Sequence, residues 1–331
     1  MTASAFRPLS GYSEPMGIVK YMGKRLLTLI PVLLGITIVA FLLGTGAPGD
    51  PVEAILNRDG TQIVSPEEYE IVKERLGLND PIPIQYIKWL RNAMTGELGQ
   101  SFFTNKDIRE QMAYRLPYTV RLALLGLGMT VVFGIGAGMV MAIYKDRWPD
   151  RILRTITTVM LSVPGFWIAI LMILIFVEQL KWLPTSGLNG WKSYIMPGIT
   201  VSVSTIGVCA RLTRTSVLDE LGRQYVTVAS AKGMNARLVA IRHVLPNALI
   251  PITTFLGNYF AGILGGSTIA EVIFNIPGIG NYAIDAVKSR DYFVVQAYVL
   301  FTAMVYVVMT MLIDLIYLAV NPKIRAGERV E

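Results

Sequence analysis

The sequence predicts an all-α polytopic membrane protein with six transmembrane helices, and three observations point to this class. Hydrophobic residues make up 53% of the chain and charged residues 16%, whereas soluble proteins carry about 25% charged residues. Apolar runs of about 18 residues or more recur, each long enough to cross the ~30 Å hydrocarbon core of a bilayer. The net charge of +7 comes from lysine and arginine that gather in alternate loops, as in cytoplasmic loops. The alternative, a large soluble protein with buried helices, is disfavoured.

The first apolar run is expected to stay in the mature protein, because it is too long for the apolar part of a signal peptide. The fourth run is the weakest, because Arg211 and Arg214 lie in its last turns. We expect these two side chains to extend to the membrane interface, where a charge costs little. The six predicted spans are 26–46, 118–142, 155–177, 195–217, 248–270 and 295–320.

Basic residues in the short loops predict the orientation. They are concentrated in the N-terminal flank, the loop 143–154, the stretch 211–247 and the C-terminal tail. The loop 178–194 carries few of them, and acids balance them in 271–294. Both termini and the stretch 211–247 are therefore expected in the cytoplasm. Alternation of six spans gives the same result.

The region 47–117 is then external, and it is predicted to be a small helical module. The segment 65–75 begins with a serine cap, a proline and acidic residues, and Gly77 supplies a stop. A second helix is expected over 85–94. We therefore expect five regions: a cytoplasmic segment 1–25, a first span 26–46, the external module 47–117, a five-span core 118–320 that contains the loop 219–247, and a cytoplasmic tail 321–331.

No catalytic constellation or cofactor site is evident. One cysteine and one histidine allow neither a disulfide framework nor a histidine–cysteine metal site within the chain. The nearest match to a phosphate-binding loop, Gly17 to Arg25, has the wrong spacing and lacks the metal-binding hydroxyl. No basic run is interleaved with aromatics, which argues against nucleic-acid binding. Glu178 and Glu271 are expected at the interface, and Asp314 is expected to have a structural role near the basic tail.

The loop 219–247 is the strongest candidate for a functional segment. Asp219 to Ala231 can form a short helix with small residues in its middle, and Gly233 supplies a left-handed residue to end it. The spacing alone leaves two interpretations open, a docking surface for a partner or an ordinary interfacial amphipathic helix. One face of this helix carries Tyr225, Val228, Ala229 and Lys232.

A resemblance favours the docking surface. Ala229-Ser-Ala-Lys-Gly233 and Arg242-His-Val-Leu-Pro-Asn-Ala248 resemble the signature loop of permease subunits of ABC importers, in its dipeptide/oligopeptide/nickel branch. Thr227, Val228 and His243 stand where the general signature has Glu, Ala and Ile. Further motifs resemble that branch in the same order: Pro48-Gly-Asp-Pro51, Arg75-Leu-Gly-Leu-Asn-Asp-Pro81, Gly96-Glu-Leu-Gly-Gln-Ser101, Phe274-Asn-Ile-Pro-Gly-Ile-Gly280, Arg290-Asp-Tyr292 and Asn321-Pro-Lys-Ile-Arg325.

The resemblance implies a non-catalytic subunit in the inner membrane of a prokaryotic cell. Its coupling helix, Tyr225 through Gly233, would dock on an ATP-hydrolysing subunit, and Leu245-Pro246 would fix the return of the chain into the fifth span. ATP and magnesium would be bound by partner subunits. The implied partners are a second homologous permease, two ATP-binding cassette subunits, an extracytoplasmic substrate-binding protein and the lipid bilayer.

The turn before the sixth span is a second candidate segment. Pro277-Gly278 and Gly280 make it tight, and a plain connector is one interpretation. The other is an external gate, or a contact for the binding protein, formed by Phe274, Asn275, Pro277 and Gly278.

The expected cargo is a di- or oligopeptide, and import of nickel, another metal chelate or glutathione remains open. The scarcity of charge within the spans argues against a path for a bare ion. A secondary transporter that works alone would need coupling carboxylates or broken helices near the midplane. An intramembrane enzyme would need a cluster of catalytic side chains, and the sequence offers neither set.

Overall fold

The computed structural model describes residues 18–46, 50–56, 64–184 and 190–320. Within these ranges the chain is helical, and its only β pairing is an isolated antiparallel bridge between Gln100 and Asp107. The predicted all-α class is therefore confirmed.

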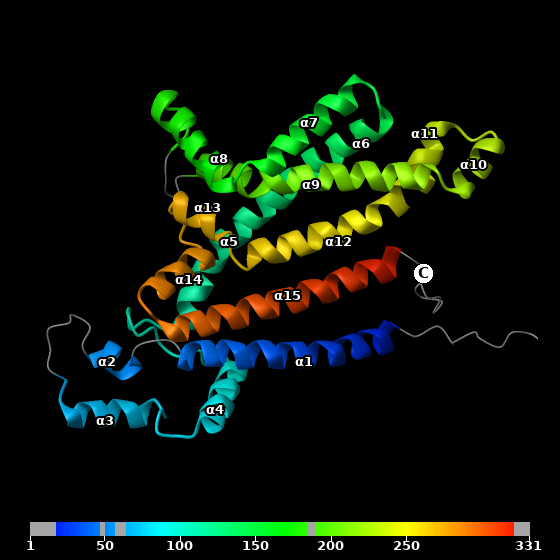
Figure 1. Cartoon of the computed structure of the whole chain (residues 1–331). Helices are drawn as coiled ribbons and strands as arrows, with labels where there is room; N and C mark the ends of the chain where they lie inside the picture. The colour runs from blue at the N-terminus through cyan, green and yellow to red at the C-terminus, as the bar shows by residue number, and fades with distance from the viewer. Residues whose placement is uncertain (1–17, 47–49, 57–63, 185–189, 321–331) are drawn as a thin grey trace, which may run out of the picture.

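Five of the described helices are long and apolar enough to cross a membrane, and together with one bent pair they make up to six spans. Figure 1 shows the long helices lying side by side. The second span is a continuous run in which the π-helical turn η1 (Thr130–Ile135) joins two α-helices. The five are α1 (Ile18–Thr45), α5–η1–α6 (Ile108–Met129, Thr130–Ile135, Gly136–Ile143), α9 (Ile195–Leu221), α12 (Leu245–Leu264) and α15 (Tyr292–Val320).

The third predicted span, 155–177, is not a straight helix. Here α7 (Trp148–Ser162) is bent by 97° from a second helix, formed by α8 (Gly165–Met172) and η2 (Ile173–Gln179). Proline lacks a backbone N–H and disfavours helical geometry in the residue before it. Accordingly, Val163, just before Pro164, is extended with φ −90° and ψ 124°. The predicted apolar stretch 155–177 is therefore present, but Pro164 divides it into two helices that are bent relative to each other.

Helix α9 lies at the centre of the bundle and packs against the second span, α7, α8 and α12. Small residues allow this approach, as in other membrane helix pairs. A Cβ atom added to Gly138 would lie 2.4 Å from the Cβ of Thr213 and 2.6 Å from the carbonyl oxygen of Ala210. Gly134 makes a similar approach to Cys209. These glycines therefore set the distance between α9 and the second span.

Helices α1 and α15 form one edge of the bundle (Figure 1). Arg25 Nε donates to Asp314 Oδ2 at 2.6 Å and joins the N-terminal part of α1 to the C-terminal part of α15. The structural role expected for Asp314 is supported, with Arg25 of the first span as its partner. The basic tail that the sequence suggested lies outside the described residues.

The region after α1 contains α2 (Pro51–Leu56), α3 (Pro66–Arg75) and α4 (Ile82–Thr95). The two predicted helices are present. Ser65 holds the N-cap position of α3, but its side chain makes no capping hydrogen bond, so that detail was wrong. Gly77 has φ +68° and ends the α3 segment as expected.

The bundle has two distinct ends (Figure 1). At the α10 end lie α10 (Gln224–Ala231), α11 (Ala236–Val239), the start of α1 and the end of α15. At the opposite end, the module end, lie α2, α3, α13 (Thr268–Ile273) and α14 (Ile279–Lys288).

Candidate functional site

The short helix α10 is reached by a break that the sequence analysis did not anticipate. A single helix was expected over 219–231, but α9 continues to Leu221 and α10 begins only at Gln224. Arg223 between them is extended, with φ −74° and ψ 145°. This extended residue turns the chain, so that α10 projects from the end of the bundle (Figure 1).

The predicted face of α10 is divided between solvent and the protein interior. Val228 is 53% exposed, and Tyr225 and Lys232 are also exposed. Ala229 is only 8% exposed. Contrary to the expectation from the sequence, it is therefore not part of a solvent-facing surface. Val226 packs against the apolar cluster of Ala142, Val217, Val244 and Ala248. Small and apolar residues therefore anchor one side of α10, while Tyr225, Val228 and Lys232 remain available.

Gly233 ends α10 in the predicted left-handed conformation, with φ +80°. Its N–H donates to the Ser230 carbonyl at 3.0 Å, and the Met234 N–H donates to the Ala229 carbonyl at 3.3 Å. A Cβ atom at Gly233 would meet nothing within 4 Å. The requirement for glycine is therefore conformational, because other residues seldom adopt positive φ.

Tyr225 connects α10 to the segment that follows it. Its hydroxyl donates to the Glu220 carboxylate, and Asn247 Nδ2 lies 3.4 Å from the same hydroxyl. Asn247 also donates to the His243 carbonyl at 2.8 Å. Partial burial and the hydrogen bond to Glu220 raise the pKa of Tyr225. Glu220 and Asn247 were missed by the sequence analysis, although Asn247 lies within one of the motifs that carried the resemblance.

Leu245 and Pro246 lie at the start of α12, as the expected return into the fifth span requires. The start is not a new helix, because α11 continues through the π-helical turn η4 (Ala240–Val244) into α12. Pro246 directly follows η4, and a local π adjustment of this kind accommodates a proline within a continuous membrane helix.

A buried ion-pair cluster lies beside the α10 end. The Asp150 side chain is fully buried, and both of its oxygens accept hydrogen bonds from Arg214, each at 2.9 Å. Arg154 Nε lies 3.4 Å from the same carboxylate. Arg214 is therefore held by a buried partner, which the sequence analysis did not anticipate. Arg211 is exposed and donates to the Thr158 hydroxyl at 2.6 Å.

The turn before the sixth span is built around Glu271, which is fully buried and not interfacial as expected. Its carboxylate accepts hydrogen bonds from the Thr119 hydroxyl and the Asn281 N–H, each at 2.9 Å. Thr119 in turn accepts a hydrogen bond from the Ile279 N–H at 2.9 Å. Glu271 thus fastens the turn to α5.

The four predicted gate residues differ in exposure. Phe274 is 2% exposed and packs in an apolar cluster with Leu122 and Met196. Gly278 is buried against Glu271. Asn275 is exposed, with φ +50°, and Pro277 is partly exposed. Only Asn275 and Pro277 can meet a partner in this conformation.

Together these features describe a bundle of membrane-length helices with a short helix projecting from one end. No group of three or more potential metal ligands occurs among the described residues. The chain belongs to the family of binding-protein-dependent transport system inner membrane components, whose family model matches residues 134–326. The model of the family's N-terminal region matches residues 18–123.

Curated relatives match along nearly the whole chain. The glutathione transport system permease protein GsiC of Pectobacterium atrosepticum is 39% identical over 308 residues, which cover 93% of this chain and 99% of that protein. The protein of the same name from Escherichia coli K12 is 36% identical over 309 residues, with the same coverage. The chain is therefore the permease of an ABC importer, a multi-pass inner-membrane protein that works with ATPase and substrate-binding partners.

Solved structures of ABC transporters are also similar. An inward-facing structure of the MetNI methionine ABC transporter is 16% identical, covers 66% of this chain and 96% of that chain, and has a TM-score of 0.46. An amino acid ABC transporter with histidines is 17% identical, covers 66% and 94% of the two chains, and has a TM-score of 0.45.

Proposed function

We propose that this chain forms half of the translocation path of an ATP-driven importer of short peptides, with glutathione as the leading candidate substrate. The similarity to glutathione permeases over 93% of the chain supports this substrate, because glutathione is itself a tripeptide. A second homologous permease completes the path. Two ATP-binding cassette subunits bind ATP and magnesium, so this chain has no catalytic role of its own.

The observation that carries the coupling role is the division of α10 into an anchored and an exposed side. Val226 and Ala229 hold the helix to the bundle, whereas Tyr225, Val228 and Lys232 face outward. A partner that moves the exposed side therefore also moves the anchored side. Tyr225 and Asn247 pass this movement to the start of α12, next to Leu245 and Pro246.

A cross-linking experiment tests this role. Val228→Cys in a Cys209→Ser background should form a cross-link to the ATPase subunit, and its yield should change between ATP-free and ATP-bound states. Leu43 is an exposed residue near the C-terminal end of α1, at the module end of the bundle. Leu43→Cys is the matched control and should form no cross-link. Equal cross-link yields from the cysteines at positions 228 and 43 would contradict the proposal that α10 contacts the ATPase subunit.

The same proposal fixes the orientation. The α10 end and both termini lie in the cytoplasm, and region 47–117 forms an extracytoplasmic module. The turn of Phe274, Asn275, Pro277 and Gly278 then lies near the substrate-binding protein, with Asn275 as the contact residue and Phe274 as its buried anchor. Cysteines at Asn275 and Val228 should react with a membrane-impermeant maleimide from opposite sides of sealed vesicles.

Uptake into vesicles that contain the complete importer and its binding protein tests the substrate. Labelled glutathione and dialanine should accumulate only when ATP is present on the α10 side. Accumulation of a nickel chelate without either peptide would replace the peptide assignment.

A further inference from the structure

An almost entirely apolar groove of about 490 Å³ lies between α5, α15 and the last turn of α4. Arg109 is the one charged residue among those that line it. The lining residues of α5 share one face of that helix: Arg109, Met112, Ala113 and Leu116. Arg109 comes first in this series, so it lies at the end of the groove nearest the start of α5. Such a groove favours a ligand that is apolar along most of its length and anionic at one end.

The length of the groove matches the thickness of one membrane leaflet. Its α15 residues run from Ala297 to Met309, a distance of about 18 Å at about 1.5 Å per residue. Helix α15 begins at Tyr292, at the module end (Figure 1), and the stretch Tyr292–Ile316 is apolar enough to cross a membrane. Half of the hydrocarbon core of a bilayer is about 15 Å thick. The groove therefore lies in the half of the bilayer nearest the module end.

The Arg109 side chain is available to a ligand. It is exposed, and it forms neither an ion pair nor a hydrogen bond with the residues that the structure describes. Asp107, which precedes it in the chain, instead caps α5 by accepting the Glu110 N–H at 3.0 Å. A guanidinium group can donate two parallel hydrogen bonds to a phosphate. Arg109 can therefore bind the phosphate of a ligand whose apolar part fills the groove.

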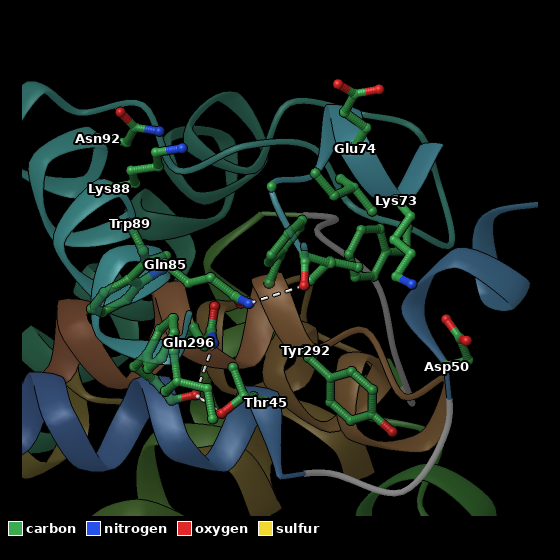
Figure 2. Close-up of a pocket in the computed structure, with 18 of the residues that line it drawn as sticks. Thr45, Asp50, Lys73, Glu74, Gln85, Lys88, Trp89, Asn92, Tyr292 and Gln296 are labelled. Carbon is green, nitrogen blue, oxygen red and sulfur yellow. Dashed lines mark hydrogen bonds between the residues drawn. The ribbon is translucent and has the colours of Figure 1, made fainter. Parts of the chain in front are cut away.

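Helix α4 is a separate indication that lipid headgroups surround this end of the groove. It runs crosswise to α1 and α15 (Figure 1), and Trp89 holds it against Phe41 of α1, with ring centroids 5.9 Å apart. In Figure 2, Lys88 extends from α4 away from α1. Ile87 and Met94, which share one face of α4, are 63% and 81% exposed. Large exposed apolar side chains beside basic ones are typical of a helix that lies at a membrane interface.

We propose that the groove binds one phospholipid from the leaflet at the module end. An acyl chain lies along α15, beside Ala297, Phe301 and Met309, and Arg109 binds the lipid phosphate. The other occupant to consider is the second permease subunit. It would bury Arg109, which is costly unless that subunit supplies an acid of its own. The proposal does not depend on which substrate the importer carries.

Native mass spectrometry of the complete importer, delipidated and then given lipid at known concentrations, measures this binding. The probes are dioleoyl phosphatidylglycerol and dioleoylglycerol, which has the same acyl chains but no phosphate. Phosphatidylglycerol should bind more tightly. Arg109→Gln should weaken its binding by about tenfold, the effect of losing one charge-assisted hydrogen bond, and should leave the binding of dioleoylglycerol unchanged. Arg91→Gln removes an exposed charge on α4 outside the groove and is the matched control.

A substitution that fills the groove tests its apolar part. Ala113 is exposed within the groove, whereas Leu124 is exposed on the same span but does not line the groove. Ala113→Phe should weaken the binding of both lipids, because its ring occupies the space of the acyl chain. Leu124→Phe is the matched control and should weaken the binding of neither.

Any of four results would overturn the site. These are equal binding of the two lipids, unchanged phosphatidylglycerol binding in Arg109→Gln, unchanged binding in Ala113→Phe, and displacement of the lipid by glycerol 3-phosphate. The last result would mean that the site recognises a free phosphate group and not a lipid.

Cross-linking tests the second permease subunit as the occupant. Met304 is 55% exposed and lines the groove. Met304→Cys in a Cys209→Ser background should therefore form no cross-link to that subunit with a short bis-maleimide. An efficient cross-link would assign the groove to the interface between the two permeases and would reject the lipid site.

Discussion

The Glu271 carboxyl group occupies the space that a side chain on Gly278 would need. A Cβ atom on Gly278 would lie 2.3 Å from the Glu271 carboxyl carbon and 2.4 Å from one of its oxygens. The backbone of Gly278 is extended, with φ −91° and ψ 179°, so it is space and not conformation that requires glycine here.

We therefore expect Gly278→Ala to displace Glu271 and release the turn from Thr119. Overpacking of this kind costs about 1–3 kcal/mol, so the thermal unfolding temperature of the purified importer should fall. Gly128→Ala is the control, because a Cβ atom there would meet nothing within 4 Å. An unfolding temperature equal to that of the control would contradict the packing described for Glu271.

Charged substitutions on α10 should separate its two sides. Val228→Asp places a charge on the exposed side, so transport should be lost while the amount of folded permease in the membrane is unchanged. Ala229→Asp places a charge in a buried position, which costs several kcal/mol, and should lower the amount of folded protein as well. Immunoblots of membranes together with uptake assays distinguish the two results, and identical behaviour would contradict the anchored side.

Gly233→Asp tests the end of α10. Aspartate tolerates positive φ better than most residues do, but less well than glycine, so we expect normal insertion with impaired ATP-driven uptake. Gly233→Asn is the neutral comparison and should retain more activity. Normal uptake by Gly233→Asp would count against the coupling role of the segment.

The buried pair of Asp150 and Arg214 should respond differently to single and double changes. Removing Asp150 leaves Arg214 without its partner, and removing Arg214 leaves the buried Asp150 with Arg154 as its remaining ion-pair partner. Breaking a buried pair costs about 3–5 kcal/mol, whereas apolar residues at both positions are often neutral. Asp150→Leu and Arg214→Met should each lower the unfolding temperature, and the double variant should recover most of the loss. Additive losses in the double variant would mean that the pair is not the source of the effect.

The two glycines of α6 provide a test of helix packing. Gly138→Ala should weaken the contact with Thr213 and Ala210, whereas Gly136 faces open space and Gly136→Ala should be tolerated. The comparison requires only the yield and monodispersity of each purified variant. Equal yields would show that the second span can move away from α9 at little cost.

Hydropathy located the apolar stretches well, because each crossing must satisfy its backbone hydrogen bonds internally and therefore forms a helix. It could not show that Pro164 bends the third stretch, because proline within an apolar helix can also be accommodated without a break, as Pro31 is in α1. The Pro164 break depends on the neighbouring residue adopting an extended backbone, which tertiary packing decides.

The charged residues were harder to place. Composition ranks Arg214 and Glu271 as surface residues, yet both are held by partners far away in the sequence, Asp150 and Thr119. Spacing within α10 placed Tyr225, Val228, Ala229 and Lys232 on one face, but Ala229 is buried and Lys232 follows the end of the helix. Which residues of such a face are buried depends on the neighbouring helices. One sequence carries little information about such pairings, because the partner of each residue is set by the fold.

The π-helical turn η4 has a mechanical consequence. Each residue of an α-helix advances by about 100° around its axis, and a π turn adds one residue without ending the helix. If the wide turn moves by one residue along η4, the residue that it passes changes its direction by about that angle, while the rest of α12 keeps its register and nothing unwinds. We therefore expect a push on α10 to change which residues at the entry to the fifth span face the neighbouring helices, without rotating the span itself.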